Sequence, residues 1–351
     1  MQLKTNLIKQ TAIRCYSNCF GDHKPVKSWS TYKLNNGMQM PMFGLGTFSG
    51  YEANSSIYTH FKPPSRHVVK AVKHAIDVGY RLIDTAFVYG NEKEVGIAVR
   101  DKINEGKIKR EDIFITSKLW NTFHSRRRAP SALGATLRNL GMDYVDLYLI
   151  HWPMGFRETG ELFPRDRYGN LCYSDVDYVE TWLALETLMK EGLTRALGVS
   201  NFSVRQLMRL IQCCDVKPVT NQIECHPYLI QRKLSLFCEL EDIAITAYSP
   251  LGSPKPDYAP LLNDPVVMRI AKERGRTPAQ VLIRYQLDRG HICIPKTFNR
   301  EQIKSNYDVF DFELNSAEMN QLNALDKNGK VRYVDLADTH KLNPFIEDDY
   351  R

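Results

Sequence analysis

Residues 143–153 read DYVDLYLIHWP, a hydrophobic run that ends in an imidazole, a large aromatic ring and a proline. The segment 144–150 is apolar at nearly every position and rich in residues that favour strands, which predicts a buried β-strand. His151, Trp152 and Pro153 follow directly. A single histidine at a strand end is most simply a structural cap. Its meaning therefore depends on what the other strands of the chain carry at the same end.

Strands of this kind alternate with helical patterns along the chain. Short, nearly all-apolar strands are predicted at residues 42–47, 81–86, 112–119, 144–152, 194–202, 218–226, 243–251 and 292–298. Amphipathic helices are predicted at residues 65–79, 92–106, 129–140, 181–191, 204–213, 233–241, 265–274, 278–288 and 301–309. Strands that are apolar on both faces are typical of a parallel sheet covered by helices. The alternation predicts one α/β domain, a (β/α)8 TIM barrel, preceded by a β-hairpin with its turn at Asn36–Gly37.

A doubly wound nucleotide-binding fold is the alternative, because GLGTFSG at residues 44–50 is rich in glycine. The third glycine of the dinucleotide fingerprint is missing at the required offset, and the acidic strand end expected about 20 residues further on is absent. The sequence therefore favours the barrel.

The composition excludes several classes of protein. Of 351 residues, 43% are hydrophobic and 25% are charged, and the net charge is +7. The densest basic run, SRRRAP at residues 125–130, is too short to indicate a nucleic-acid partner. No apolar run is long enough to span a membrane. The eight cysteines are scattered without metal-ligand spacing, so we expect reduced thiols in an intracellular compartment and no metal.

The first 28 residues differ from the rest, because they carry several cations and only one acidic residue. They resemble a mitochondrial presequence, with RCYS at residues 14–17 as a candidate cleavage region. The alternative is a basic tail on a cytoplasmic protein. Residues 29–351 are then the barrel domain.

Polar or ionisable residues follow every predicted strand, although the strands themselves are apolar. In chain order they are Thr47, Asp84, Lys118, His151, Ser200, Asn201, Gln222, Tyr248, Ser249, Lys296 and Thr297. The carboxyl ends of barrel strands meet at one face, where such folds carry their active sites. The sequence therefore predicts a pocket at this face, with His151 in it.

Asp84, Tyr89, Lys118 and His151 suggest a reaction. A free tyrosine has a pKa near 10 and is a poor acid at neutral pH. A buried ammonium beside the phenol lowers that pKa, and Lys118 is positioned to supply it while Asp84 keeps the lysine charged. His151 can orient a carbonyl oxygen by a hydrogen bond. This set suits protonation of an oxygen that gains negative charge.

Such a reduction also needs a hydride, which no protein side chain can supply. The later strand ends are suited to a nicotinamide cofactor. Ser200, Asn201 and Gln222 can bind a carboxamide, and Tyr248 offers a ring for stacking. Lys296 and Thr297 can hold a phosphate.

The motifs GLGT, IDTAFVYGNE, ITSKLW, LYLIHWP, GVSNF, NQIECHPYL, YSPLGS and IPKTFNREQIKSN resemble the aldo-keto reductase superfamily, and most closely its aldose and aldehyde reductase branch. The resemblance runs from about Trp29 to the C-terminus. It implies a monomeric NADPH-dependent carbonyl reductase with a C-terminal substrate loop, and it gives Tyr89, Lys118, Asp84 and His151 the roles described above. Positions that match cofactor-binding residues of the family are Thr47, Asp84, Ser200, Asn201, Gln222, Tyr248, Ser249, Leu251, Ser253, Lys296, Thr297 and Asn306. Positions that match its substrate pocket are Phe48, Trp120, His151 and Trp152.

The chain departs from the family pattern at several positions. Gln302 stands where this branch usually has an arginine at the adenine and its 2′-phosphate, and Lys255 replaces an aspartate of the cofactor clamp. Phe48 stands where a pocket tryptophan is typical, and residues 49–61 look like an insertion. Some barrels of this family serve as cofactor-sensing subunits or structural proteins, and that is the alternative to an enzyme.

Overall fold

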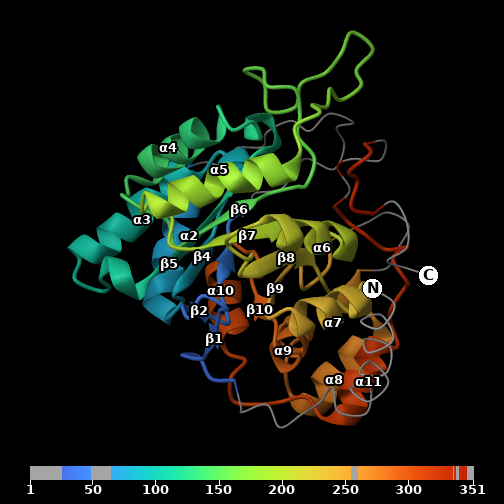
Figure 1. Cartoon of the computed structure of the whole chain (residues 1–351). Coiled ribbons are helices and arrows are strands. Elements are labelled where there is room, and N and C mark those ends of the chain that lie inside the picture. The colour runs from blue at the N-terminus through green and yellow to red at the C-terminus, as the bar shows by residue number, and fades with distance from the viewer. Residues whose placement is uncertain (1–25, 49–64, 254–259, 335, 337–339, 346–351) are drawn as a thin grey trace.

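The protein forms a closed barrel of parallel strands surrounded by helices (Figure 1). The computed structural model describes residues 26–48, 65–253, 260–334, 336 and 340–345. The strands pair with their sequence neighbours in the order β3 (Leu45–Gly46), β4 (Leu82–Asp84), β5 (Phe114–Leu119), β6 (Leu147–Ile150), β7 (Leu197–Ser200), β8 (Thr220–Glu224), β9 (Ala244–Tyr248) and β10 (Ile292–Cys293). Hydrogen bonds from Gly44 N to Cys293 O and from Gly46 N to Pro295 O, both 3.0 Å, close the barrel. The predicted TIM-barrel fold is confirmed.

Helices cover the outside of the barrel in Figure 1. They are α2 (Ser65–Val78), α3 (Glu92–Asn104), α4 (Ala129–Leu140), α5 (Tyr178–Lys190), α6 (Val204–Cys213), α7 (Arg232–Leu240), α8 (Pro265–Arg274), α9 (Pro278–Asp288), α10 (Arg300–Tyr307) and α11 (Ser316–Asn323). The apolar faces of α2 to α7, α9 and α10 pack on the outward side chains of the strands in one large core. The sequence analysis missed α11. It packs with α8 and α9 around a second apolar cluster.

The strands are shorter than predicted. The last one, expected at residues 292–298, ends at Cys293, and Pro295 soon after it has no N–H to donate to a neighbouring strand. The strand expected at residues 144–152 covers only Leu147–Ile150. His151 therefore lies just beyond its strand, at the rim of the barrel.

An antiparallel hairpin closes one end of the barrel. Its strands are β1 (Thr31–Lys33) and β2 (Gln39–Pro41), and Gly37 has a φ of +85° in the predicted turn. Leu34 and Met40 of the hairpin belong to one buried cluster with the barrel residues Leu82, Phe114 and Leu147. This apolar plug leaves the opposite end of the barrel for a site.

Side chains alternate along each strand, and this alternation places the polar groups. In β4, Leu82 joins the interior cluster, Ile83 joins the outer core, and Asp84 therefore faces the interior again. In β5 the same alternation points Phe114 and Lys118 inward. A layer of ionisable groups thus lies inside the barrel, above the apolar plug.

Some predictions fall outside the described residues. They concern most of the N-terminal extension, the insertion at residues 49–61 and Lys255. Within the described part of the chain, no helix is long and apolar enough to cross a membrane. No cluster of acidic, histidine and cysteine side chains that would suit a metal ion occurs in that same part.

Candidate active site

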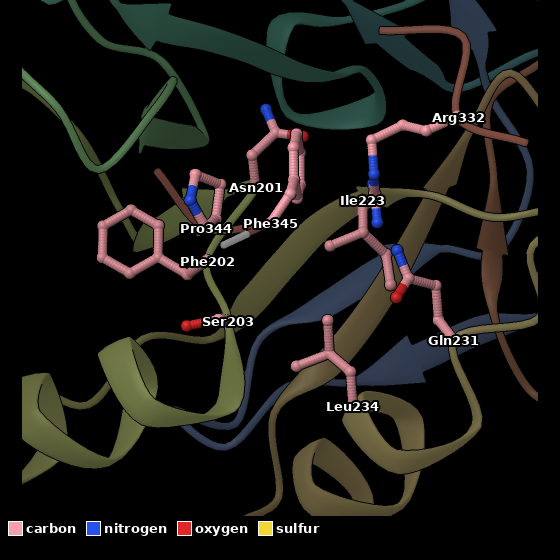
Figure 2. Close-up of a pocket in the computed structure, with 9 residues that line it drawn as sticks. All are labelled: Asn201, Phe202, Ser203, Ile223, Gln231, Leu234, Arg332, Pro344 and Phe345. Carbon is pink, nitrogen blue, oxygen red and sulfur yellow. The ribbon is translucent and has the colours of Figure 1, made fainter. Parts of the chain in front are cut away.

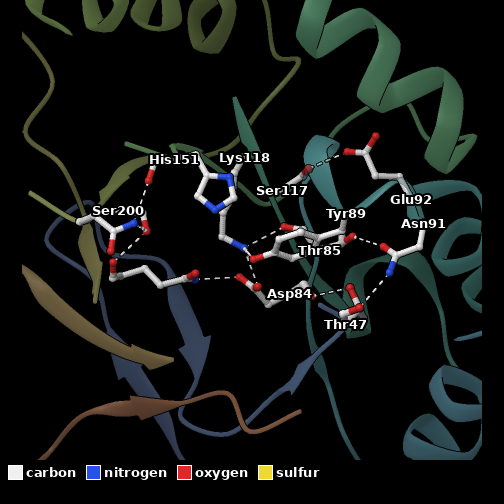
Figure 3. Close-up of polar contacts among 12 residues, drawn as sticks. Thr47, Asp84, Thr85, Tyr89, Asn91, Glu92, Ser117, Lys118, His151 and Ser200 are labelled. Carbon is white, nitrogen blue, oxygen red and sulfur yellow. Dashed lines mark hydrogen bonds and ion pairs between the residues drawn. The ribbon is translucent and has the colours of Figure 1, made fainter. Parts of the chain in front are cut away.

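The centre of the site is a buried ion pair (Figure 3). The ammonium of Lys118 donates to Asp84 Oδ1 at 2.5 Å and to the carbonyl oxygen of Thr85 at 2.9 Å. Lys118 has no exposed surface, and Asp84 is 3% exposed. Burial lowers the pKa of Lys118 below its ordinary value, although the charge of Asp84 opposes this effect. The other oxygen of Asp84 accepts a hydrogen bond of 2.7 Å from the amide of Gln222.

Tyr89 lies beside this ion pair. It ends a 3-10 helix, Phe87–Tyr89, and Gly90 after it adopts a left-handed conformation with φ of +64°. The phenol oxygen lies 3.4 Å from the Lys118 ammonium, which also sits 4.9 Å from the centre of the tyrosine ring. The structure therefore brings the predicted phenol, cation and carboxylate together.

Asn91 and Glu92 brace the segment that carries Tyr89, and the sequence analysis missed them. The Asn91 amide donates to the carbonyl of Thr47 at 2.8 Å and accepts from the Thr85 hydroxyl at 3.0 Å. Glu92 accepts from the hydroxyl of Ser117, the neighbour of Lys118, at 2.7 Å. Burial raises the pKa of Glu92. The signal for both was their position directly after Tyr89-Gly90, at the start of a helix.

His151 faces Tyr89 across the site. Its ring centre lies 5.8 Å from that of Tyr89 and 5.4 Å from that of Trp120, and both contacts are edge-on. Burial, together with the nearby Lys118 ammonium, holds the pKa of His151 well below its usual value. The ring is therefore neutral at neutral pH, and its Nδ1 has no hydrogen-bond partner among the described residues. A neutral imidazole can donate one hydrogen bond without carrying charge.

Aromatic side chains form the wall of the site. The ring centre of Phe48 lies 5.0 Å from that of Tyr89, so the predicted pocket residue is in place. The Trp120 indole donates to the carbonyl of Leu162 at 2.7 Å, and its ring lies 5.1 Å from that of Phe163. These two residues belong to the extension between β6 and α5, drawn in green in Figure 1, which projects from the barrel. No sequence motif pointed to them.

Trp152 lies at the other side of this wall. Its ring centre is 5.8 Å from that of Phe345 near the C-terminus, in an edge-on contact. The apolar cluster that contains Trp120 and Trp152 also includes Val334, Leu336, Leu342 and Phe345 from the C-terminal segment. Segments distant in sequence thus share one apolar cluster beside Tyr89 and His151.

The polar residues at the ends of β7, β8 and β9 form a linked group. The Asn201 amide donates to the carbonyl of His151 at 3.0 Å, and the Tyr248 hydroxyl donates to Asn201 Oδ1 at 2.8 Å. The hydroxyl of Ser200 donates to the carbonyl of Gln222 at 2.8 Å. Asn201 and Ser249 have positive φ angles of 62° and 48°, a strained conformation often found at binding sites. The sequence analysis placed Gln222 at the end of its strand. In the structure Gln222 lies inside β8, and Glu224 is the last residue of that strand.

The segment from β10 into α10 carries the residues predicted to hold a phosphate. Lys296 is exposed, and neighbouring protein displaces enough water to lower the pKa of its ammonium. No carboxylate pairs with it in the described parts of the chain. The Thr297 hydroxyl donates to Gln302 Oε1 at 2.5 Å, and Asn306 is buried in α10. A cation next to a hydroxyl, with no carboxylate on it among the described residues, fits a bound phosphate.

Leu251 and Ser253 complete the predicted cofactor positions, in the turn after β9. Gly252 between them has a φ of +69°, which favours glycine at that point. The predicted site residues therefore lie at or near the carboxyl ends of the strands, except Asn306, which lies in the last turn of α10.

Chemically, the arrangement suits protonation of an oxygen atom. The Tyr89 phenol lies beside the Lys118 ammonium, and the neutral His151 imidazole faces the phenol next to an apolar cluster. Each of them stabilises negative charge that develops on an oxygen held there.

Comparisons with known proteins agree with this chemistry. A family model described as Aldo/keto reductase family matches residues 43–327. Aldo-keto reductase family 1 member A1 of Homo sapiens is 45% identical over 307 residues, which covers 86% of this chain and 90% of that protein. Aldo-keto reductase family 1 member D1 of Mus musculus is 46% identical over 311 residues, covering 86% and 92%. The solved structure of the aldose reductase from Schistosoma japonicum has a TM-score of 0.81 and 40% identity, and covers 91% of this chain and 99% of that one.

Proposed function

The chain belongs to the aldo/keto reductase family of oxidoreductases, and we propose that it reduces aldehydes and some ketones to alcohols with NADPH. The observation that carries this proposal is the contact of the Tyr89 hydroxyl with the buried Lys118 ammonium at 3.4 Å. A cation at this distance from a phenol favours loss of the phenol proton. The proton then has an acceptor when negative charge develops on a carbonyl oxygen nearby.

In this proposal the catalytic residues are Asp84, Tyr89, Lys118 and His151. Tyr89 transfers its proton to the carbonyl oxygen, and Lys118 stabilises the tyrosinate that remains. Asp84 holds the ammonium in place through its contact of 2.5 Å. His151 donates a hydrogen bond to the same oxygen and orients it, which a neutral ring can do without competing for the proton. The reduced nicotinamide, when bound, supplies the hydride to the carbonyl carbon.

For the cofactor site we propose the polar residues that end β7 to β10. Ser200, Asn201 and Gln222 bind the carboxamide, which requires that the cofactor replace some of the hydrogen bonds they make with one another and with Asp84. Tyr248 stacks on the nicotinamide ring. Lys296 and Thr297 hold the 2′-phosphate, and the remaining members of the site are Thr47, Ser249, Leu251, Ser253 and Asn306. NADPH is preferred over NADH, but less strongly than where an arginine stands in place of Gln302.

For the substrate site we propose Phe48, Trp120, His151 and Trp152. The surrounding wall is apolar and aromatic. Aromatic rings bury large apolar area, so this wall favours aromatic or alkyl carbonyl compounds over sugars rich in hydroxyl groups.

The test of this function is turnover. The protein is incubated with NADPH and 4-nitrobenzaldehyde, and consumption of NADPH and formation of the alcohol are both measured. We expect equal amounts of the two. NADPH binding without alcohol formation would instead indicate a cofactor-sensing or structural role.

We further propose a monomeric barrel domain preceded by a basic extension. The predicted boundary between residues 28 and 29 lies inside the packed chain, because Val26 is buried in the main core and its carbonyl oxygen accepts from Arg284 at 3.3 Å. The location is then the cytoplasm, or the mitochondrion if the extension is a presequence. Sequencing the N-terminus of the protein from its own cells distinguishes the two, because an intact Met1 in a cytosolic fraction would contradict import.

A further inference from the structure

A buried carboxylate at the end of β8 takes no part in the proposed chemistry. Glu224 has no exposed surface and lies two residues after Gln222, so both side chains point to the same side of the strand. Gln222 reaches Asp84 in the centre of the site. Glu224 lies two residues further along the same strand, toward the end of the barrel that the hairpin leaves open.

Glu224 accepts hydrogen bonds from the backbone of the C-terminal segment. Tyr333 N lies 2.9 Å from Oε1 and 3.1 Å from Oε2, and Val334 N lies 3.0 Å from Oε2. His226, also fully buried, contributes its Nε2 at 2.9 Å from Oε1. A buried charge is tolerated only when its lone pairs are satisfied in this way.

The electrostatics agree with a charged Glu224. Burial is the largest single influence and acts to raise its pKa, but His226, Arg332 and the Tyr333 amide together outweigh burial. The pKa of Glu224 is therefore below its usual value, and the side chain is a carboxylate at neutral pH. Hydrogen bonds to a carboxylate are about twice as strong as those between neutral groups.

The backbone that Glu224 holds continues into the wall of the substrate pocket. Val334 belongs to the apolar cluster of Trp120 and Trp152. Arg332 lies over the ring of Phe345, with its guanidinium carbon 3.6 Å from the ring centre, and Phe345 contacts Trp152. Arg332, Pro344 and Phe345 line a small pocket opposite residues that follow β7 and β8 (Figure 2).

We propose that Glu224 is a positioning residue that sets substrate specificity. It fixes the backbone of Tyr333 and Val334 and thereby the place of the C-terminal wall of the pocket. This inference rests on the proposed carbonyl reduction. A bulky carbonyl compound has more surface to place against this wall than a small aldehyde has, so Glu224 governs the binding of bulky carbonyl compounds more than the hydride transfer itself.

The test compares Glu224→Met with Glu224→Gln. Methionine has a similar length but accepts no strong hydrogen bond, so both backbone N–H groups lose their acceptor. Glutamine keeps one carbonyl oxygen, which can still accept from Tyr333 and Val334, and should restore most of the function. Glu318→Met is the matched control, because Glu318 of α11 is also buried and accepts from the backbone N–H of Asn315 and from Arg274.

The first measurement is steady-state kinetics with two aldehydes, propanal and 2-naphthaldehyde. In Glu224→Met we expect KM for 2-naphthaldehyde to rise roughly 10-fold, the effect of losing one charged hydrogen-bonding partner. We expect KM and kcat for propanal to change much less, and Glu224→Gln to lie between the two proteins. A loss of the same size for both aldehydes, or no change for either, would overturn the proposal.

The second measurement is hydrogen–deuterium exchange, which needs no turnover. In Glu224→Met the amides of Tyr333 and Val334 should exchange roughly 10-fold faster, while those of β5 and β6 stay as they are. Glu318→Met should leave residues 333 and 334 unchanged. If the unmodified protein proves inactive with every aldehyde, the proposed reduction fails, whereas unchanged exchange at Tyr333 and Val334 contradicts the role of Glu224 itself.

Discussion

The ends of β4, β5 and β6 and the segment from β10 into α10 carry polar residues at the same end of the barrel, but they are built differently. In the first region, Lys118 and Asp84 are buried and hydrogen-bonded to each other at 2.5 Å. In the second, Lys296 and Gln302 are exposed, and the contact of Gln302 is to a neighbouring hydroxyl. Buried polar groups require fixed partners, whereas exposed ones can exchange theirs with water.

This difference separates two properties of the protein. The chemistry depends on buried side chains that are each other's hydrogen-bond partners. A substitution of one of them therefore disturbs the others. Cofactor preference depends on exposed side chains, each of which can be changed with little effect on the fold. Substitutions in the two regions should therefore differ in size and in kind.

The largest effect is expected from Tyr89→Phe. The ring remains, but the proton donor is lost, and general acid catalysis typically contributes about 10²- to 10⁴-fold to a rate. We expect kcat to fall by this amount while NADPH still quenches the protein fluorescence. A variant that keeps more than a tenth of the original rate would exclude Tyr89 as the donor.

The next largest effect is expected from Lys118→Met, on stability as well as on activity. Removal of the ammonium leaves Asp84 buried without its cation, which typically costs about 3–5 kcal/mol in the free energy of unfolding. Urea denaturation measures this loss. Adding Asp84→Asn should restore much of the stability but none of the activity, because a neutral amide at this position leaves no buried charge.

The control for this change is Arg269→Met. Arg269 and Glu273 form an ion pair on the surface of α8, with about half of each side chain exposed. Such pairs contribute only about 0–1 kcal/mol. Equal losses in the two variants would mean that the ion pair of Lys118 and Asp84 is no more critical than a surface pair.

A smaller effect is expected in the open region from Gln302→Arg. An added guanidinium near Lys296 and Thr297 gives a 2′-phosphate a further charged partner, worth about 1.5–3 kcal/mol. The ratio of kcat/KM for NADPH to that for NADH should rise roughly 10- to 100-fold. Gln302→Leu, which removes the amide without adding charge, should change the ratio far less. A ratio that stays constant in Gln302→Arg would place the phosphate elsewhere.

The smallest effect is expected from mild acid. It lowers the free energy of unfolding through a buried histidine near the first region. His124 follows β5 and has no exposed surface, and burial lowers its pKa to about 3. In the unfolded chain the His124 imidazole takes up a proton near pH 6.5, whereas in the folded protein it stays neutral. The folded state is therefore favoured most at pH values above 6.5. This contribution is lost as the pH falls from 6.5 toward 3. By pH 5.5 the loss is about 1.4 kcal/mol.

Urea denaturation at pH 7.5 and pH 5.5 measures this loss. His124→Asn should reduce the difference in stability between the two pH values by about 1.4 kcal/mol, because asparagine does not titrate. An unchanged pH dependence in His124→Asn would show that His124 is not the source.

Much of the fold was predictable from local pattern. The helices at residues 129–140, 204–213, 265–274 and 278–288 have the predicted bounds, because each has a clear apolar face and a defined start such as the capping box of Ser203 or Thr277. Strand ends were less predictable. Hydrogen bonds to neighbouring strands decide where a strand stops, and those neighbours lie far away in sequence.

The sequence by itself determined the barrel, the plugging hairpin and the candidate residues at the strand ends. These features can be read from local properties of the chain: the spacing of its apolar residues, its turn residues, and the polar residues that follow apolar strands. Only the tertiary structure decided the partners: the bracing of Tyr89 by Asn91 and Glu92, the contact of Trp120 with Leu162, and the hold of Glu224 on Tyr333 and Val334. These contacts join segments up to 110 residues apart. They form because burial removes water from polar groups, and each group must then bond to whatever donor or acceptor the fold brings within reach.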